Sequence, residues 1–168
     1  MEVEEASGPL TFEEFFQAQR DRLFRTLCLI TGSRDEAEDL AQEAFVKVLE
    51  RWDALQDVED PSGYLHRTAM NAFRSRVRRA ATAARRALGD VRPPDLYEHV
   101  DDRMVTMQAM GTLSPRQRAA VVLTDLLGYT AEEAGSLLGV RGSTVRALHF
   151  QARSALRAHL TRRETTDE

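Results

Sequence analysis

The stretch best suited to binding a partner is residues 139–153, GVRGSTVRALHFQAR. A turn with two glycines leads into two hydroxyl side chains and then into arginines at helical spacing. Arginine can donate two parallel hydrogen bonds to guanine in the major groove of DNA. Hydroxyls and backbone N–H groups at the start of a helix suit phosphate. The predicted contacts are a base for Arg146 and phosphates for Arg141, Ser143 and Thr144.

The same run carries an aromatic ring among its cationic side chains. Helical spacing directs Val145 and Leu148 inward and leaves Phe150 and Arg153 pointing outward, with His149 beside them. Phe150 either meets the methyl group of a thymine or packs against another domain or a partner. The sequence favours neither interpretation.

A shorter helix before this run indicates a helix-turn-helix unit. Residues 130–138 begin with Thr130 and place Glu133 three positions later, which is a capping-box pattern. Ala134 and Gly135 are small enough to let two helices approach closely. In such units the first helix crosses the DNA backbone and the second enters the major groove. The pattern therefore predicts binding to duplex DNA.

A second basic segment lies earlier in the chain. Residues 61–89 contain seven arginines and no acidic residue. Aromatic rings among cationic side chains suit single-stranded DNA, because every base offers a flat face for stacking. His66 and Phe73 are interleaved with the arginines, although a merely solvated basic face is the alternative. The apolar face of the same predicted helix consists of Leu65, Ala69, Ala72, Phe73 and Val77. One stripe of the predicted helix, at relative positions 0, 3, 7, 10 and 14, holds Tyr64, Arg67, Asn71, Arg74 and Arg78, which we call the arginine stripe.

The predicted helix over residues 33–52 has the opposite charge. Its apolar positions recur at helical spacing from Ala37 to Trp52, while the other face is mostly acidic. Such a face is either solvated or docks on a basic partner. The residues predicted to dock, which we call the docking face, are Asp39, Gln42, Glu43, Phe45 and Val46.

These segments require an all-α protein of two small helical domains joined by a flexible linker. The first domain is predicted over residues 11–87 and the second over 102–161. Between them, 88–101 contains Gly89 and a pair of prolines, which break helical periodicity. Helix starts are expected at capping residues, and helix ends at glycines. The expected starts are Thr11, Ser33, Ser62, Ser114, Thr130 and Ser143, and the expected ends are Gly32, Gly128 and Gly139.

Charge is distributed unevenly along the 168 residues. The formal net charge is −4, which by itself argues against a nucleic-acid-binding protein. Residues 1–60, however, carry 16 acidic and 6 basic side chains, whereas 114–168 carry eight arginines and no acid between Glu133 and Glu164. Local potential decides what docks at each surface. The sequence thus predicts an acidic N-terminal half and two basic surfaces.

Several classes of protein are disfavoured. No apolar run approaches the roughly 20 residues of a membrane helix, and the acidic N-terminus does not resemble a signal peptide, so we expect a cytoplasmic protein without membrane insertion. The single cysteine, Cys28, lies in an apolar run and is expected in the core. The four histidines are scattered, and no nucleophile–base pair or phosphate loop is present. We therefore expect no metal, no cofactor and no enzymatic activity.

Three stretches together resemble the extracytoplasmic-function (ECF, group four) sigma factors of bacterial RNA polymerase. The stretch DEAEDLAQEAFVKVLERW is similar to that family's polymerase-binding helix, and PSGYLHRTAMNAFRSRVRR to its promoter-melting helix. The run from Leu113 to Leu160 is similar to its C-terminal helix-turn-helix domain. The resemblance covers about residues 11–161. The chain has 22 arginines and one lysine, a bias typical of GC-rich genomes such as those of actinobacteria.

The resemblance implies a transcription initiation factor with two DNA-binding surfaces. The docking face would bind the β′ clamp of core RNA polymerase, and the second domain would lie near the β flap. The arginine stripe and the 55–62 loop would hold an unstacked base of the −10 element. The residues implied in reading the −35 duplex are Arg141, Ser143, Thr144, Arg146, His149, Phe150 and Arg153. The linker would pass near the RNA exit channel, and an anti-sigma factor is an implied further partner.

Three places depart from the family's usual pattern. Tyr64 stands where tryptophan is common, and Phe73-Arg74-Ser75 replaces a segment that usually contains an acid. The recognition helix reads ALHFQAR where the family often has a more polar run. The alternative function is a conventional helix-turn-helix regulator that binds DNA without core polymerase. Such a regulator needs a dimer interface to span two half-sites. The sequence shows no heptad seam, and that alternative leaves the acidic helix at 33–52 unexplained.

Overall fold

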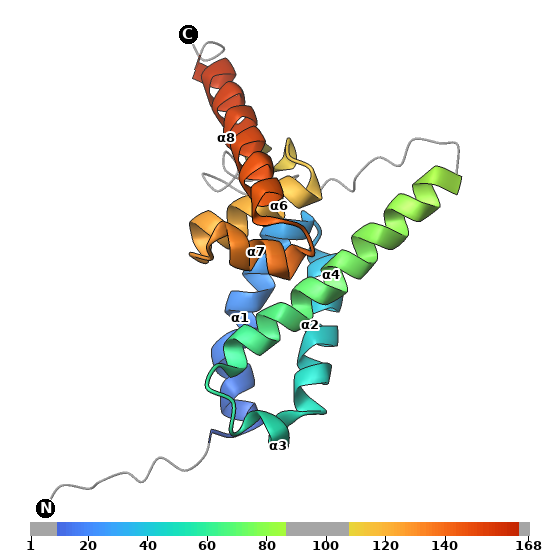
Figure 1. The fold of residues 1–168 in the computed structure, drawn as a ribbon, viewed down its shortest axis with the longest axis vertical. Coiled ribbons are helices and arrows are strands. Elements are labelled where there is room, and N and C mark those ends of the chain that lie inside the picture. Colours follow the sequence, from blue (N-terminus) through green and yellow to red (C-terminus); the bar gives the residue numbers. More distant parts are fainter. Residues whose placement is uncertain (1–9, 87–107, 165–168) are drawn as a thin grey trace, which may run out of the picture.

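The computed structural model describes residues 10–86 and 108–164, which we call the first and second domain, and these residues are all helix, turn or loop (Figure 1). The all-α prediction is confirmed for them. The predicted linker, 88–101, lies outside the described residues, so the predicted domain boundaries stay predictions. The first domain contains α1 (Phe12–Thr31), α2 (Arg34–Leu49), α3 (Trp52–Leu55) and α4 (Pro61–Arg86). The second contains a short helical segment at 108–111, α6 (Pro115–Val121), the π-helical turn η1 (Val122–Leu126), α7 (Ala131–Leu138) and α8 (Gly142–Glu164).

Most helix ends lie where the capping residues predicted them. Thr11 and Glu14 form the expected capping box, in which the Thr11 N–H donates to the Glu14 carboxylate at 2.9 Å. Gly32 ends α1 with a φ of 71°, a left-handed conformation that glycine adopts without strain. Ser33 accepts from the Glu36 N–H at 3.2 Å, so only that half of the predicted box forms at α2. Reciprocal boxes also form at Ser114 and Thr130.

Some boundaries differ from the predictions. The predicted loop after residue 52 contains α3. The predicted start of α4 at Ser62 is one residue late, because Pro61 occupies the first helical turn, where its missing N–H has no helical partner to lose. Ser143 is not the N-cap of α8. The carbonyl of Arg141 accepts from the N–H groups of Thr144 and Val145 at 2.9 and 3.2 Å, which puts the helix start before Ser143.

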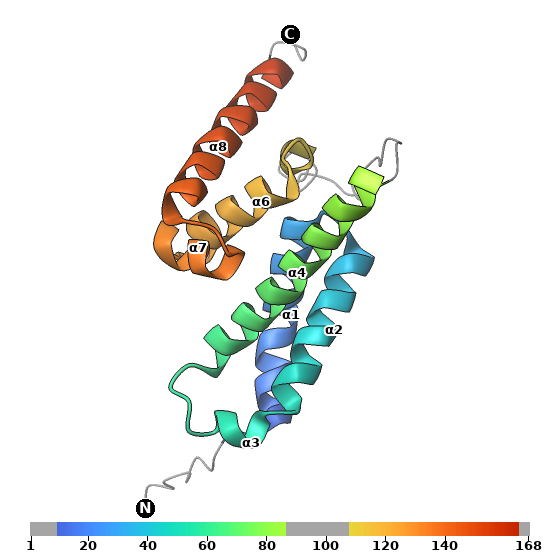
Figure 2. The same ribbon diagram turned by 45° about the vertical axis from the view of Figure 1, so that its right-hand side comes forward.

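The first domain is built around α1, α2 and α4, which lie side by side in both ribbon views (Figures 1 and 2). Their apolar stripes meet in a core in which Leu23, Leu27, Leu40 and Leu65 have no exposed surface. Burying one such side chain stabilises the fold by about 1.5–3 kcal/mol. Cys28 packs against this core, as expected, and burial raises the pKa of its thiol. An aromatic cluster closes the end near α3 and contains Phe12, Phe15, Phe16, Phe45 and Trp52.

The two domains pack against each other, an arrangement that the sequence did not predict. Helix α6 lies against α1, and α7 lies against α4 (Figures 1 and 2). The buried guanidinium of Arg118 on α6 donates to the carbonyls of Ile30 at 2.8 Å and Thr31 at 2.9 Å, the last two residues of α1. A third bond runs to the Leu113 carbonyl at 2.9 Å. Because the last turn of α1 has no basic residue of its own, an arginine of the second domain supplies the cation that a helix C-terminus favours.

Candidate nucleic-acid and polymerase interfaces

The turn between α7 and α8 is held by close backbone packing. Gly139 ends α7 with a φ of 66°, and the chain then turns directly into α8. A Cβ on Gly135 would lie 2.8 Å from the backbone oxygen of Val140, nearer than a side chain permits, so the two helices can approach only at a glycine. Val145 and Ala152 have no exposed surface and anchor α8 inward. The predicted helix-turn-helix geometry is present.

The opposite side of α8 is open to solvent. Phe150 keeps 76% of its surface exposed, so the interpretation in which it packs on another domain of this chain is wrong for the described structure. His149, by contrast, is half-buried, and its Nε2 lies 2.7 Å from a carboxylate oxygen of Asp125 in η1. That pair ties α8 to η1. The remaining residues predicted to contact the −35 duplex are all exposed, and we call them the recognition face: Arg141, Ser143, Thr144, Arg146, Phe150 and Arg153.

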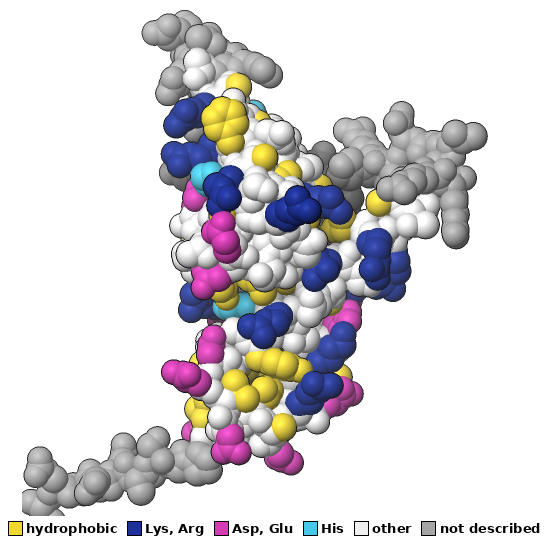
Figure 3. Space-filling model, in the orientation of Figure 1, with side chains coloured by type: hydrophobic (Ala, Val, Ile, Leu, Met, Phe, Trp, Pro, Cys, Tyr) yellow, Lys and Arg dark blue, Asp and Glu magenta, His cyan; other side chains and the backbone are white. Residues whose placement is uncertain are grey.

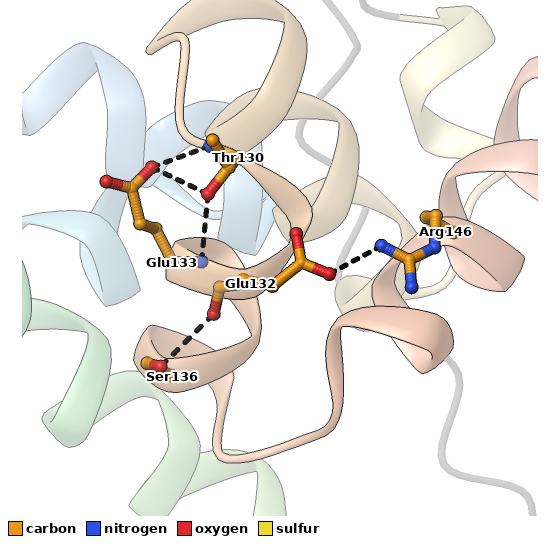
Figure 4. A network of polar contacts seen from close by, with 5 residues as sticks. All are labelled: Thr130, Glu132, Glu133, Ser136 and Arg146. Carbon is orange, nitrogen blue, oxygen red and sulfur yellow. Dashed lines mark hydrogen bonds and ion pairs between the residues drawn. The ribbon is translucent and has the colours of Figure 1, made fainter.

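Two glutamates of α7 have different partners beside this face (Figure 4). Glu133 accepts from the N–H and hydroxyl of Thr130, both at 2.8 Å, and these bonds lower the pKa of its carboxyl. Glu132 accepts from Nη1 of Arg146 at 2.6 Å, and this bond is the main cause that lowers the pKa of Glu132. The arginine predicted to contact a base therefore already holds a carboxylate. Sequence reasoning missed this pair, because nothing in the spacing of residues 132 and 146 indicates contact.

The arginine stripe follows the outer side of α4. Arg67, Asn71, Arg74 and Arg78 are exposed, and Tyr64 is half-buried. The Asn71 amide oxygen accepts from Nη1 of Arg74 at 3.3 Å. Lys and Arg side chains gather along α4 and along α8 on the face that Figure 3 shows, whereas Asp and Glu lie mainly toward the lower end. One molecular face thus presents both predicted DNA-binding surfaces.

Two aromatic residues predicted among the arginines are buried instead. His66 is 7% exposed and Phe73 is 2% exposed, because both fall on the core-facing side of α4. Neither can stack on a base in this structure, so that part of the prediction is wrong, whereas the predicted place of Phe73 on the apolar face of the helix is confirmed. His66 instead meets the second domain, where its Nδ1 lies 3.3 Å from the hydroxyl of Tyr129. Burial, reinforced by the nearby Arg22, lowers the pKa of His66.

The docking face on α2 is acidic and partly apolar. Asp39, Gln42 and Val46 are exposed, and Glu43 is half-buried. Phe45 is only 6% exposed, since its ring packs edge-on against Phe16 with centroids 4.8 Å apart, and its predicted exposure is wrong.

Ion pairs hold two acids of this face. Nζ of Lys47 donates to Glu43 at 2.7 Å, which lowers the pKa of that carboxyl. Arg76 of α4 lies 3.4 Å from Asp39. The acidic helix is therefore partly neutralised by its own chain.

A groove of about 760 Å³ runs beside this face, between α1 and α2. Phe45, Val46 and Leu49 are among the residues that line it. Leu49 was predicted on the inner, apolar face of the helix but is 53% exposed. Exposed leucine and valine beside aromatic rings can bury apolar area when a partner docks. The groove thus adds an apolar component to a surface that the sequence described mainly by charge.

Comparison with known proteins decides the family. Profiles described as Sigma-70 region 2 and Sigma-70 region 4 match residues 15–83 and 103–156. The ECF RNA polymerase sigma factor SigE of Mycolicibacterium smegmatis is 33% identical over 165 residues, covering 90% of this chain and 62% of that protein. The RNA polymerase sigma-E factor of Streptomyces antibioticus is 32% identical over 157 residues, covering 92% and 87%. The chain belongs to the ECF sigma factors.

As a member of this family, the sigma factor directs RNA polymerase to promoters, and its relatives are transcription factors rather than enzymes. The alternative of a conventional helix-turn-helix regulator is therefore wrong. A solved structure titled as the sigma factor RpoE in complex with the anti-sigma factor NepR, from Bartonella quintana, superposes with a TM-score of 0.67. It is 21% identical and covers 89% of this chain and 96% of that one, which shows a shared fold.

In this sigma factor the second domain contacts part of the arginine stripe. A cavity of about 340 Å³ lies between the domains, lined by Asn71, Arg74 and Arg78 of α4 and by Arg116 of α6. The guanidinium of Arg74 lies where a Cβ on Gly139 would be placed, at the C-terminus of α7. Side chains implied in −10 binding are thus in contact with the domain implied in −35 binding.

Within residues 10–86 and 108–164, no helix could span a membrane and no group of side chains could hold a metal ion.

Proposed function

We propose that this sigma factor reads the −35 element with the recognition face and holds the −10 element with the arginine stripe. The observation that carries the first assignment is α8 itself. Its inner side is anchored by fully buried Val145 and Ala152, and its outer side leaves Arg146, Phe150 and Arg153 open to solvent. A rigid helix with an exposed cationic face is what the major groove admits.

The docking face and the adjacent groove are proposed to bind core RNA polymerase at the β′ clamp. Support comes from the exposed Val46 and Leu49, which suit an apolar partner, and from the acids around them, which suit a basic one. A contact near the β flap is proposed for the second domain. We also propose that the protein acts in the cytoplasm and works without catalytic activity, cofactor or metal.

The test is binding to purified core polymerase followed by run-off transcription from a promoter library. Stable binding and selective transcription are expected from the full chain. Val46→Asp is expected to weaken core binding at least tenfold, since it places a charge in the apolar contact. Glu13→Asp, a conservative change at an exposed site on α1, is the control. Equal core binding by the two variants would move the polymerase contact elsewhere.

The −35 assignment has its own variants. Arg146→Ala is expected to reduce −35-dependent transcription by about ten- to a hundredfold, because a bidentate base contact contributes about 1–3 kcal/mol. Core binding is expected to survive. Arg157→Ala, three turns further along α8 and also exposed, is the matched control. Equal loss in both variants would reduce the role of α8 to general charge.

An anti-sigma factor is also proposed as a partner. The likeness to a sigma factor solved with an anti-sigma factor supports this proposal, as does the apolar groove beside α2. A protein that occupies the groove is expected to compete with core polymerase. Leu49→Asp is expected to weaken direct binding of the anti-sigma factor to the free sigma factor, and unchanged binding would place the partner outside the groove.

A further inference from the structure

The carboxylate of Glu132 lies beside two groups that are proposed to bind DNA, the guanidinium of Arg146 and the N-terminus of α8. One of its oxygens is 2.6 Å from Nη1 of Arg146. The same oxygen would lie 2.7 Å from a Cβ on Gly142, so it sits beside the first residue of α8. The start of a helix is where backbone N–H groups favour phosphate, and Arg146 is the side chain proposed to meet a base. Figure 4 shows the two side chains reaching toward each other from α7 and α8.

The pair is accessible to DNA. The side chains of Arg146 and Glu132 are 60% and 69% exposed, so a duplex can reach both without unfolding the unit. Only Nη1 of Arg146 has a partner among the described residues. The second amino group and Nε therefore remain available, and these two donors suffice for two parallel hydrogen bonds to guanine.

We propose that Glu132 is a positioning residue that sets the base selectivity of Arg146, an inference that rests on the proposed −35 function of α8. The carboxylate holds one edge of the planar guanidinium and thereby orients the other edge. Its negative charge also opposes phosphates at the start of α8, which lowers the affinity for every DNA sequence, so a larger share of the remaining affinity comes from the base contact. Glu132 lowers total affinity for DNA and raises discrimination between bases.

A purely structural role for Glu132 is the competing explanation. An acid in the first turn of α7 interacts favourably with the helix dipole wherever its side chain points. Glu133 separates the two explanations, because it is also an exposed glutamate in the first turn of α7, as Glu132 is. It differs in its partner, since it binds Thr130 and not Arg146.

The experiment measures transcription by the reconstituted holoenzyme from promoters in which each −35 base is varied in turn. The chain variants are Glu132→Gln, Glu132→Ala, Glu133→Gln and Arg146→Ala. Glu132→Gln is expected to lower the preference for the best base at one position roughly threefold, and Glu132→Ala roughly tenfold, which is about 1.4 kcal/mol. Binding to DNA without a promoter is expected to rise in both. Glu133→Gln is expected to keep the preference within twofold, even where its loss of a cap lowers the melting temperature.

The outcomes distinguish a failure of the positioning role of Glu132 from a failure of the proposed −35 function of α8. If Arg146→Ala abolishes the preference while the Glu132 variants match Glu133→Gln, the positioning role is wrong and the −35 assignment stands. If Arg146→Ala itself leaves every preference unchanged, the −35 assignment fails. A fall in melting temperature alone, with unchanged base preference in the Glu132 variants, also overturns the proposal. Glu132→Ala loses the same contact, so it decides the question if Glu132→Gln does not fold.

Discussion

Replacing Arg118 by methionine is expected to separate the two domains. Methionine fills a similar apolar volume but removes the guanidinium that bonds the carbonyls of Ile30 and Thr31. Both carbonyls lie at the end of α1, where no other basic residue stands in the last turn. Arg118 is 6% exposed, so water does not replace these bonds while the domains stay packed.

The expected loss of free energy between the packed domains follows from the hydrogen bonds that Arg118 makes across the interface. A hydrogen bond to a charged donor contributes about 1.5–3 kcal/mol. Two such bonds cross the domain interface, so the lower limit gives about 3 kcal/mol and a roughly hundredfold shift from packed to separated molecules. The third bond, to Leu113, lies within the second domain, and its loss is expected to lower the melting temperature of that domain as well.

Energy transfer between dyes on the two domains measures the shift. Cysteines introduced at the exposed residues Glu50 and Ser154 would carry the dyes, after Cys28→Ala. Arg118→Met is expected to lower the transfer efficiency and broaden its distribution. Arg118→Lys keeps the charge but not the planar fork of donors, so it is expected to give an intermediate value.

The control for this experiment is Arg116→Met. Arg116 stands on the same helix, is exposed, and has no hydrogen bond or ion pair within the described structure. Its replacement is expected to leave the energy transfer unchanged. If Arg118→Met gives the same transfer efficiency as Arg116→Met, the guanidinium does not hold the domains together, and the reasoning from its three bonds is refuted.

Three further predictions concern single contacts. Gly135→Ala is expected to destabilise the second domain by about 1–3 kcal/mol, because the new Cβ would meet the backbone of the following turn; Ser136→Ala, at an exposed neighbour, should change the melting temperature little. Burial lowers the pKa of His66 in the folded protein, so the unfolded chain binds more protons below about pH 6.5 and stability should fall as pH drops through that range. Thermal melts between pH 8 and 5.5 would show this, and His66→Leu should remove the dependence. Lys47→Gln should raise the pKa of Glu43 toward its ordinary value, because the hydrogen bond from Lys47 is the main cause that lowers it. Titration of Glu43 by NMR measures this, and a pKa that stays low in the variant would contradict the prediction.

Much of the fold could be predicted because its signals are local. The boxes at Thr11, Ser114 and Thr130 each join residues three positions apart. Capping and helical periodicity act over one turn, so the sequence displays them directly. The same locality explains the successful prediction of the turn at Gly139 and of the outward side of α8, because both follow from the phase of one helix.

Errors arose where burial depends on a second helix. Phe45 and His66 were expected to be accessible but are buried, and neighbouring helices decide whether such residues are covered. Phe45 is covered by Phe16 of α1, and His66 is covered in part by Tyr129 of the second domain. No spacing within α2 or α4 carries that information.

The sequence by itself determined the long helices, most of their caps, the helix-turn-helix unit, the two basic surfaces and the resemblance to ECF sigma factors. Tertiary structure alone decided which groups meet across elements: Glu132 with Arg146, 14 positions apart, and Arg118 with Ile30, 88 positions apart. Contacts over such separations depend on how whole helices pack, and packing depends on the combined shape of many side chains. The bond between Glu132 and Arg146 and the contact of the second domain with the arginine stripe therefore became visible only in the folded chain.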